Sequence, residues 1–316
     1  MATTILCTRV DGAVDLLNLE GLVKKHTINV GYIGDDPTGD ICATLSGNGE
    51  FLAVKCSDYS FSTFNVASGL QLRRFDDIRD SVTDQPKQCE ISAIGFTQTG
   101  HTVLRAGEGG IIAYDMKSGD ILYQVRSYLD GFLTVLKVSP DDKTFVVGDG
   151  NGEVAQFSVD EGSCIYKPGV DRAWFHSLDP DTEPTQLFAV AWAPDSEIYY
   201  LGYEDGQVTF VKSTFNLCES HPDNGLIIEP DGNPVNSLCV SPDGKHVAVA
   251  GGYSGTHRGF VSVWETGSSK LVWKQPVDSY VYDVWWSQDG ENIATSGSDH
   301  VRQWNATNGG NVPPYC

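Results

Sequence analysis

Short apolar runs alternate with turn residues along the whole chain. In residues 241–252, SPDGKHVAVAGG, a turn of Pro, Asp and Gly precedes a run in which valine and alanine alternate. Short β-branched or aromatic runs bounded by Gly, Asp, Asn and Pro are typical of β-strands, and no sustained 3.6-residue period is present. Variants of the phrase recur as SGNGEFLAVKC, TQTGHTVLRAG, SPDDKTFVVGD, APDSEIYYLGY and SQDGENIATSG. The pattern therefore predicts an all-β chain built from internal repeats.

A second strand follows each phrase and places the copies in one register. The aligned apolar position recurs at intervals typical of a unit of four short strands, so we expect small antiparallel sheets repeated radially around an axis. We name the strands of each unit a, b, c and d, from the axis outward. The aligned position is occupied, in seven successive copies, by Leu17, Phe64, Tyr114, Phe157, Val211, Trp264 and Trp304.

The phrases SPDGKHVAVAGG, VSVWETG and SGSDHVRQWN resemble WD-repeat proteins, and the likeness extends over essentially the whole chain. The resemblance implies one domain, residues 1–316, folded as a seven-bladed β-propeller of four-stranded antiparallel blades. The repeats are degenerate, because no Gly-His pair precedes an a strand and no copy ends in Trp-Asp. Of the family's His-Ser-Asp-Trp network, only the last copy retains three expected members, Ser296, Asp299 and Trp304. We expect blade packing to depend on apolar burial instead.

The closure of the ring stays open at this point. The first copy begins at its b strand, ILCTRV (5–10), and lacks an a strand, while the last copy ends soon after its c strand. Residues 311–316 are the candidates to complete either copy. Their two prolines make a poor central strand and a tolerable edge strand. Either the first blade is short, or the tail closes the ring.

The connections predict two unlike faces. In an up-and-down sheet the a–b and c–d turns share one face, and the b–c and d–a loops share the other. We assign the long segments 31–40, 76–90, 168–186 and 221–234 to d–a loops and 252–259 to a b–c loop. Every large insertion then falls on one face, the face that WD-repeat relatives most often use to hold peptides and proteins. The competing interpretation is that loops lengthen wherever lengthening is tolerated.

Aromatic and basic residues in these loops are the candidate partner-binding residues. Trp174 and Phe175, beside Arg172, either anchor a partner or fold back over the blade edge. The b–c insertion contributes another group, and the a strand of the last copy begins with tyrosines that either line the mouth of the axial channel or fill the blade. These further candidates are Tyr253, His257, Arg258 and Tyr280, with Tyr282 nearby.

Charge favours a protein partner over nucleic acid or lipid. The formal net charge of −21 repels phosphate backbones and anionic membranes, although acidity that only maintains solubility is an equal alternative. Asp35, Asp36, Asp179 and Asp181 lie in the long loops, where they would steer basic segments of a partner. The chain shows no apolar run long enough for a membrane helix and no signal peptide. We expect a cytoplasmic protein, with the nucleus or a large assembly as open alternatives.

No motif for catalysis is visible. The sequence contains no nucleophile elbow, Walker loop, HExxH or CxxC, and its histidines occupy dissimilar places in the repeat. We therefore expect a non-catalytic scaffold without a cofactor, one subunit of a multi-subunit complex, that binds peptide or protein partners on the long-loop face. The alternative is a metal-dependent propeller hydrolase, similar to lactonases, with an axial metal site.

Overall fold

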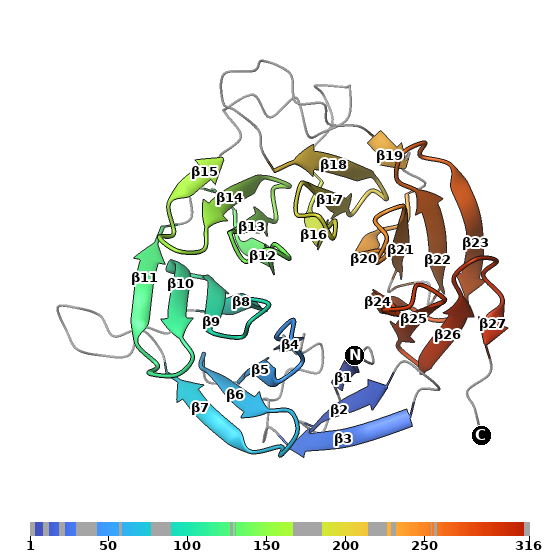
Figure 1. The fold of residues 1–316 in the computed structure, drawn as a ribbon. Helices are drawn as coiled ribbons and strands as arrows, with labels where there is room; N and C mark the ends of the chain where they lie inside the picture. Colours follow the sequence, from blue (N-terminus) through green and yellow to red (C-terminus); the bar gives the residue numbers. More distant parts are fainter. Residues whose placement is uncertain are drawn as a thin grey trace.

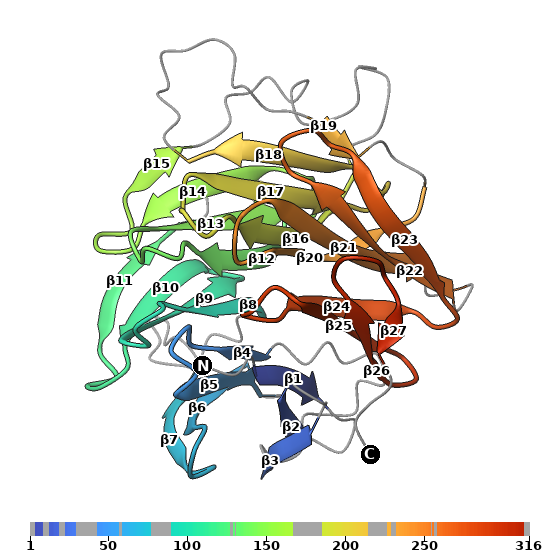
Figure 2. The same ribbon diagram turned by 45° about the vertical axis from the view of Figure 1, so that its right-hand side comes forward.

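A ring of β-sheets forms the protein (Figure 1). The computed structural model describes residues 4–8, 13–18, 23–29, 43–56, 59–76, 90–126, 129, 131–166, 185–213, 226–228, 232–253, 255 and 258–312. Within them, seven antiparallel sheets follow one another in chain order around an axis. Figure 2 shows the same sheets in an oblique view, with neighbouring sheets packed against each other. The predicted all-β propeller architecture is confirmed.

Each sheet is one blade, numbered in chain order. Blade 1 contains β1 (Thr4–Thr8), β2 (Ala13–Asn18) and β3 (Val23–Asn29). Blades 2 to 4 contain β4 (Ala43–Leu45), β5 (Phe51–Lys55), β6 (Phe61–Asn65) and β7 (Gln71–Phe75); β8 (Ile91–Phe96), β9 (Thr102–Gly107), β10 (Gly110–Asp115) and β11 (Ile121–Val125); and β12 (Leu133–Val138), β13 (Thr144–Asp149), β14 (Val154–Ser158) and β15 (Cys164–Tyr166). Blades 5 to 7 contain β16 (Leu187–Trp192), β17 (Ile198–Tyr203), β18 (Val208–Lys212) and β19 (Leu226–Ile228); β20 (Val235–Val240), β21 (His246–Tyr253), β22 (Arg258–Glu265) and β23 (Leu271–Val277); and β24 (Val281–Trp286), β25 (Asn292–Gly297), β26 (Val301–Asn305) and β27 (Asn311–Val312).

The strand register identifies which strands are present in the first and last blades. In blades 2, 3, 4 and 6 the pairing of strands c and d shifts just before the aligned position, as between Val263 and Trp264. Blade 1 has the same shift between Leu16 and Leu17. Strand β2 is therefore a c strand and β1 a b strand, so blade 1 has three strands and no a strand among the described residues. The pair Asn311–Val312 joins β26 as the outer strand of blade 7. Within the described residues the first blade is therefore the short one, whereas residues 313–316 of the tail lie outside them.

Apolar side chains fill the space between neighbouring blades. Each pair of consecutive blades from 1 to 7 shares its own cluster of buried residues. Between blades 6 and 7, for example, Val261 and Val263 meet Val284 and Trp304. Burying side chains of this size contributes about 1.5–3 kcal/mol each. The expected dependence of blade packing on apolar burial agrees with these clusters.

The repeated Ser-Pro-Asp-Gly phrase builds a hydrogen-bonded a–b turn. Ser241 Oγ donates to Asp243 Oδ1 at 2.6 Å and accepts the His246 N–H at 2.9 Å. Asp243 Oδ1 also accepts the Lys245 N–H at 3.1 Å. These hydrogen bonds lower the pKa of Asp243 below its usual value. Asp and Ser bond nearby backbone in tight turns, which explains why the phrase recurs. Equivalent pairs are Ser46–Asn48, Ser139–Asp141 and Ser287–Asp289.

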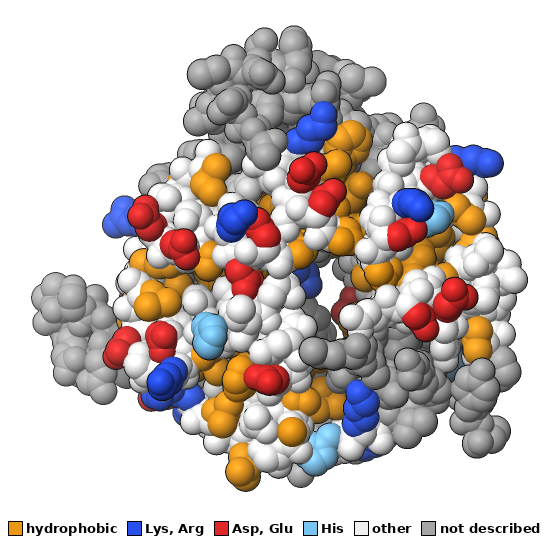
Figure 3. Space-filling model, in the orientation of Figure 1, with side chains coloured by type: hydrophobic (Ala, Val, Ile, Leu, Met, Phe, Trp, Pro, Cys, Tyr) orange, Lys and Arg blue, Asp and Glu red, His pale blue; other side chains and the backbone are white. Residues whose placement is uncertain are grey.

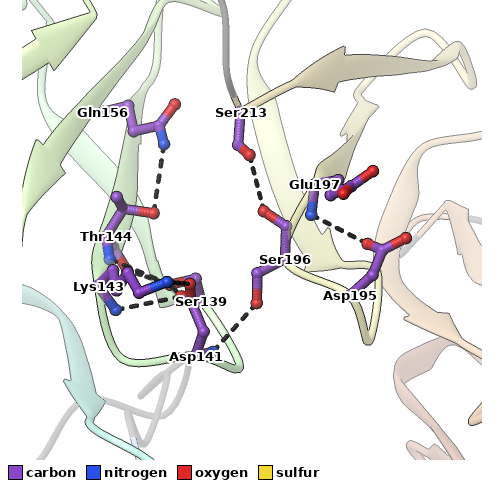
Figure 4. Close-up of polar contacts among 9 residues, drawn as sticks. All are labelled: Ser139, Asp141, Lys143, Thr144, Gln156, Asp195, Ser196, Glu197 and Ser213. Atoms are coloured by element: carbon purple, nitrogen blue, oxygen red, sulfur yellow. Dashed lines mark hydrogen bonds and ion pairs between the residues drawn. The ribbon is translucent and has the colours of Figure 1, made fainter.

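One position of this turn requires a left-handed backbone. Glycine occupies it in most copies, for example Gly244 with φ of 72°. In blades 4 and 5 the position is taken by Asp142 and Ser196, with φ of 61° and 63°. Figure 4 shows that Ser196 Oγ accepts the Asp141 N–H of the neighbouring blade, at 3.0 Å. A side chain at the strained position therefore links two blades.

A second set of contacts links blades at the outer rim. The hydroxyl of Tyr123, on β11, donates to the Val159 carbonyl of the next blade at 2.7 Å. In the same way Trp273 Nε1 on β23 donates to the Ala306 carbonyl at 2.7 Å. Each ring lies against a turn glycine with positive φ, where an added Cβ would come within 2.5 Å of Tyr123 or 2.6 Å of Trp273. Outer strands are thus fastened to the c–d turn of the following blade.

The expected polar network in the last copy differs at two of its three members. Trp304 Nε1 donates to Thr295 Oγ1 at 3.0 Å, so Thr295 and not Ser296 is its partner. Asp299 instead pairs with Arg302. The expected partner was one residue too far along the strand. Adjacent residues of a strand point to opposite faces of the sheet, so only Thr295 lies on the same face as the Trp304 ring.

Candidate functional site

Two faces of the ring can be defined from strand ends. The loop face contains the starts of the a strands and the ends of the b strands; the turn face contains the opposite ends. The segments 30–42, 77–89 and 167–184 connect d strands to a strands, as expected. The assignment of 221–234 to a d–a loop is wrong, because residues 226–228 form β19 and pair with β18.

This pairing changes the distribution of the long segments. Residues 213–225 connect the c strand β18 to the d strand β19, which is a connection of the turn face. The expectation that every large insertion falls on the loop face is therefore incorrect. The loop face still contains most of the long connections, and it is the face on which the described candidates lie.

Most of the sequence-predicted site residues lie outside the described residues. Those residues stay predictions. They are Arg172, Trp174, Phe175, His257, Asp35, Asp36, Asp179 and Asp181. The described candidates are Tyr253, Arg258 and Tyr280, to which Tyr282 can be added.

Tyr253 and Arg258 are the outermost paired residues of the longest hairpin in the described residues. They face each other as the last residue of β21 and the first of β22. Both side chains are exposed, and 53% of Tyr253 is accessible to solvent. The eight-residue strands β21 and β22 extend this hairpin beyond the others. The sequence therefore identified an exposed aromatic and an exposed cation on the loop face.

Blade 7 lies directly against this hairpin. A Cβ added to Gly259 would come within 2.5 Å of the Ser279 carbonyl oxygen and 2.8 Å of Val281 Cγ2. Close approach of two backbones is a common reason for glycine in a strand. Gly259 thus allows the start of β24 to pack beside the tip that bears Arg258.

Tyr280 and Tyr282 lie at the start of β24. Their rings form an edge-to-face pair with centroids 5.0 Å apart. Tyr282 is 53% exposed, and Tyr280 is half-buried. Of the two alternatives, lining a surface or filling the blade, the exposure of Tyr282 favours the surface.

A charged cluster borders these tyrosines. Asp299 Oδ1 accepts from Arg302 Nη1 at 2.9 Å, and the same guanidinium nitrogen donates to Ser279 Oγ at 3.2 Å. His300 Nδ1 lies 3.0 Å from Asp299 Oδ2. The hydrogen bonds from Arg302 lower the pKa of Asp299. We call the six residues Tyr253, Arg258, Tyr280, Tyr282, Asp299 and Arg302 the blade 6–7 surface.

Phe132 is a loop-face residue that the sequence reasoning missed. It immediately precedes β12 and is 77% exposed, the largest fraction among the exposed large apolar residues of the described chain. The signal was present, since a phenylalanine stands at the end of a d–a connection. Figure 1 places β12 on the other side of the axis from β24. Phe132 is therefore separate from the blade 6–7 surface.

Polar groups also occur along the axis. Ser237 of β20 donates a hydrogen bond to Asp283 of β24, and burial raises the pKa of Asp283. Figure 3 shows one face of the ring, with acidic and basic side chains in small groups around a central opening. Among the described residues, no group of three His, Cys, Asp or Glu side chains is placed to hold a metal ion. Nor do these residues include a helix of the length and apolarity needed to cross a bilayer.

Comparison with known families identifies repeats in the last third of the chain. Residues 220–265 and 268–305 match the WD40 family, described as WD domain, G-beta repeat. These segments cover most of blades 6 and 7, whose strands form the blade 6–7 surface. No curated protein matches the chain.

Proposed function

We propose, from the premise that the chain carries WD40 repeats within residues 220–305, that it is a non-catalytic scaffold that binds a protein partner on its loop face. WD40 domains typically mediate protein interactions and are generally non-catalytic. In this proposal residues 1–316 act as one propeller domain. The protein would be one subunit of a cytoplasmic complex and would need no cofactor.

The observation that supports the proposal is the exposure of two tyrosines on one surface. Tyr253 and Tyr282 each leave 53% of their area in contact with solvent, at neighbouring blades. Tyrosine and arginine are enriched among the residues that dominate binding energy at interfaces. Arg258 and the Arg302–Asp299 pair provide polar groups around them. The blade 6–7 surface thus combines aromatic anchors with a charged border.

Charge complementarity favours a basic partner segment. The formal net charge of −21 would attract a basic chain over distances longer than a hydrogen bond. The acidic loop residues named from the sequence would add to this attraction. Association should accordingly weaken as ionic strength rises.

The proposal is tested by affinity capture from native extract with quantitative mass spectrometry. The variant Tyr253→Ala/Tyr282→Ala should lose the main captured protein, because both substitutions remove exposed rings without opening the core. Leu122→Ala is the matched control, since Leu122 on the outer strand β11 is 51% exposed and lies away from the loop face. Capture that is undiminished in the double variant would contradict the proposed surface. Phe132→Ala asks separately whether blade 4 takes part.

A further inference from the structure

The inner edge of blade 1 is unlike that of every other blade. Strand β1 pairs with β2 on one side, and the described residues supply no strand on its other side. The b strands of all other blades lie between an a strand and a c strand. Figure 1 shows β1 as the innermost strand of its sheet, in the part of the ring between β24 and β4. Among the strands that the structure describes, the inner circle of a strands is thus interrupted at blade 1.

An edge of this kind can pair with another strand. Along an edge strand, alternate residues present N–H and C=O groups that no neighbouring strand satisfies. Proteins use such edges to bind extended peptides, whose backbone completes the hydrogen-bond ladder. The residues Thr4–Thr8 provide five positions for such pairing.

We propose that an extended segment of a partner protein pairs antiparallel with β1 and becomes the a strand of blade 1. This interaction is distinct from the blade 6–7 surface and does not depend on it. The segment would be flanked by blades 2 and 7, whose a strands are β4 and β24.

The other blades specify the chemistry of this segment. Their six-residue a strands have a side chain no larger than valine or aspartate at the third position, buried apolar side chains at the first and fourth, and an apolar side chain at the sixth, which is buried in every one except β12, where Val138 is partly buried. In blade 7 the fourth and sixth positions are Val284 and Trp286, both buried. By the register of blade 7, the fourth residue of the partner segment would lie opposite Cys7, and the sixth opposite Ile5. The template strands are Ile91–Phe96, Leu133–Val138, Leu187–Trp192, Val235–Val240 and Val281–Trp286.

The expected segment is therefore six residues long, apolar at positions one, four and six, and extended. Basic residues beside it would be favoured by the net charge of −21. The strand β12, LTVLKV, is an example from this chain that already combines the apolar pattern with a lysine.

The test uses a fluorescent peptide with the sequence LTVLKV between pairs of lysines. Binding is followed by anisotropy, and amide hydrogen exchange is followed within Thr4–Thr8 of the intact chain. One control peptide has N-methyl groups on the amides that would face β1, and a second has aspartate at the fourth position. The proposal predicts binding of the first peptide, slower exchange at alternate amides of β1, and affinity at least about tenfold lower for each control.

Three results would overturn the proposal. The first is no binding of the unmodified peptide. The second is equal binding of the N-methylated control, which would show that backbone pairing is not used. The third is slow exchange at every amide of Thr4–Thr8 in the free protein, which would show that this edge is already paired. The Tyr253→Ala/Tyr282→Ala variant should bind the peptide as the wild type does. A negative result for peptide pairing with β1 is therefore distinguishable from a negative result for the proposed loop-face function.

Discussion

The carboxylate of Asp142 accepts the backbone N–H of Gln98 from the neighbouring blade. Its second oxygen accepts the Thr99 N–H at 3.2 Å. Asp142 lies in the left-handed region, with φ of 61°, at a turn position that glycine occupies in most other copies. A residue that this backbone conformation disfavours relative to glycine therefore links the a–b turns of blades 3 and 4.

Replacement of Asp142 by glycine separates these two effects. Relief of the left-handed strain would stabilise the fold by up to about 1 kcal/mol. Loss of two hydrogen bonds to a charged acceptor would cost more, about 1.5–3 kcal/mol each before solvent screening. We expect Asp142→Gly to lower the free energy of unfolding by about 1 kcal/mol in a denaturant titration. Asp142→Asn, which tolerates the same backbone, should have a free energy of unfolding between those of the wild type and the glycine variant. A glycine variant more stable than the wild type would contradict the linking role.

The Ser-Asp turn gives a matched pair of substitutions. Ser241→Ala removes the hydroxyl that contacts Asp243 and His246, and should lower the free energy of unfolding by about 1 kcal/mol. Blade 5 has Ala193 at the equivalent place, with Asp195 two residues later accepting the Glu197 N–H at 2.9 Å. Ala193→Ser should restore the missing bond and raise the free energy of unfolding. If both substitutions raised the free energy of unfolding, or both lowered it, the result would contradict this role of the serine.

The same turn predicts a pH dependence. Hydrogen bonds from Ser241 and from the Lys245 N–H lower the pKa of Asp243. A carboxyl whose pKa is lower in the folded state stabilises the fold above its unfolded pKa, and this contribution is lost as pH falls through the folded pKa. The difference in stability between wild type and Ser241→Ala should therefore be largest near about pH 7 and shrink below about pH 4. Parallel denaturation curves at both pH values measure it, and a difference that grows on acidification would be the wrong sign.

Arg105 is a buried cation without a hydrogen-bond partner among the described residues. All three of its side-chain nitrogens are unsatisfied, and the residue is only 1% exposed. At the same register position other blades have Val147, Leu201 and Val249. We expect Arg105→Leu to raise the free energy of unfolding by about 2 kcal/mol, because a buried unpaired charge is costly.

The matched control for Arg105 is Arg73→Leu. Arg73 Nη2 donates to the Lys117 carbonyl of the next blade at 2.9 Å, so this substitution should lower stability. Thermal or denaturant unfolding of both variants gives the comparison. A loss of stability in Arg105→Leu similar to that in Arg73→Leu would mean that Arg105 has a stabilising partner after all.

Cys239 should react slowly with alkylating agents. Burial raises the pKa of its thiol to about 11, from a usual value of 9.0. Because only the thiolate reacts, the reactive fraction near pH 8.5 is roughly 100-fold lower than for an ordinary thiol. Iodoacetamide labelling followed by mass spectrometry should modify the exposed Cys164 well before Cys239. Labelling at comparable rates would contradict the burial of this thiol.

The sequence predicted the repeat well because local chemistry and register agree. The apolar positions of the c strands, such as Tyr114 and Trp304, pair with b strands in equivalent register, and the Ser-Asp turns separate the strands as expected. The strand β19 was missed because it has only three residues and is separated from β18 by a long connection. Nothing in a short apolar run such as LII distinguishes a strand from a loop.

The site was less predictable for another physical reason. The sequence identifies loop aromatics such as Trp174 as candidate anchors by residue type, but their exposure depends on tertiary packing. Trp174 itself lies outside the described residues. The exposure of Tyr282 depends on its place at the start of β24, and that of Phe132 on the entry to β12. The choice of Thr295 over Ser296 as the partner of Trp304 depends on which strand face each residue occupies. These properties depend on the position of each side chain in the folded sheet, which composition alone does not provide.

Photo-cross-linking tests the central claim of the loop-face interface most directly. A photoreactive phenylalanine analogue is placed at Tyr282 on the loop face or, in a separate protein, at Leu122 on an outer strand; both positions are exposed. After irradiation in native extract, the account predicts a discrete cross-linked product from position 282 that is absent from position 122 and weakened by Tyr253→Ala. A discrete product from position 122 with none from position 282 would contradict it.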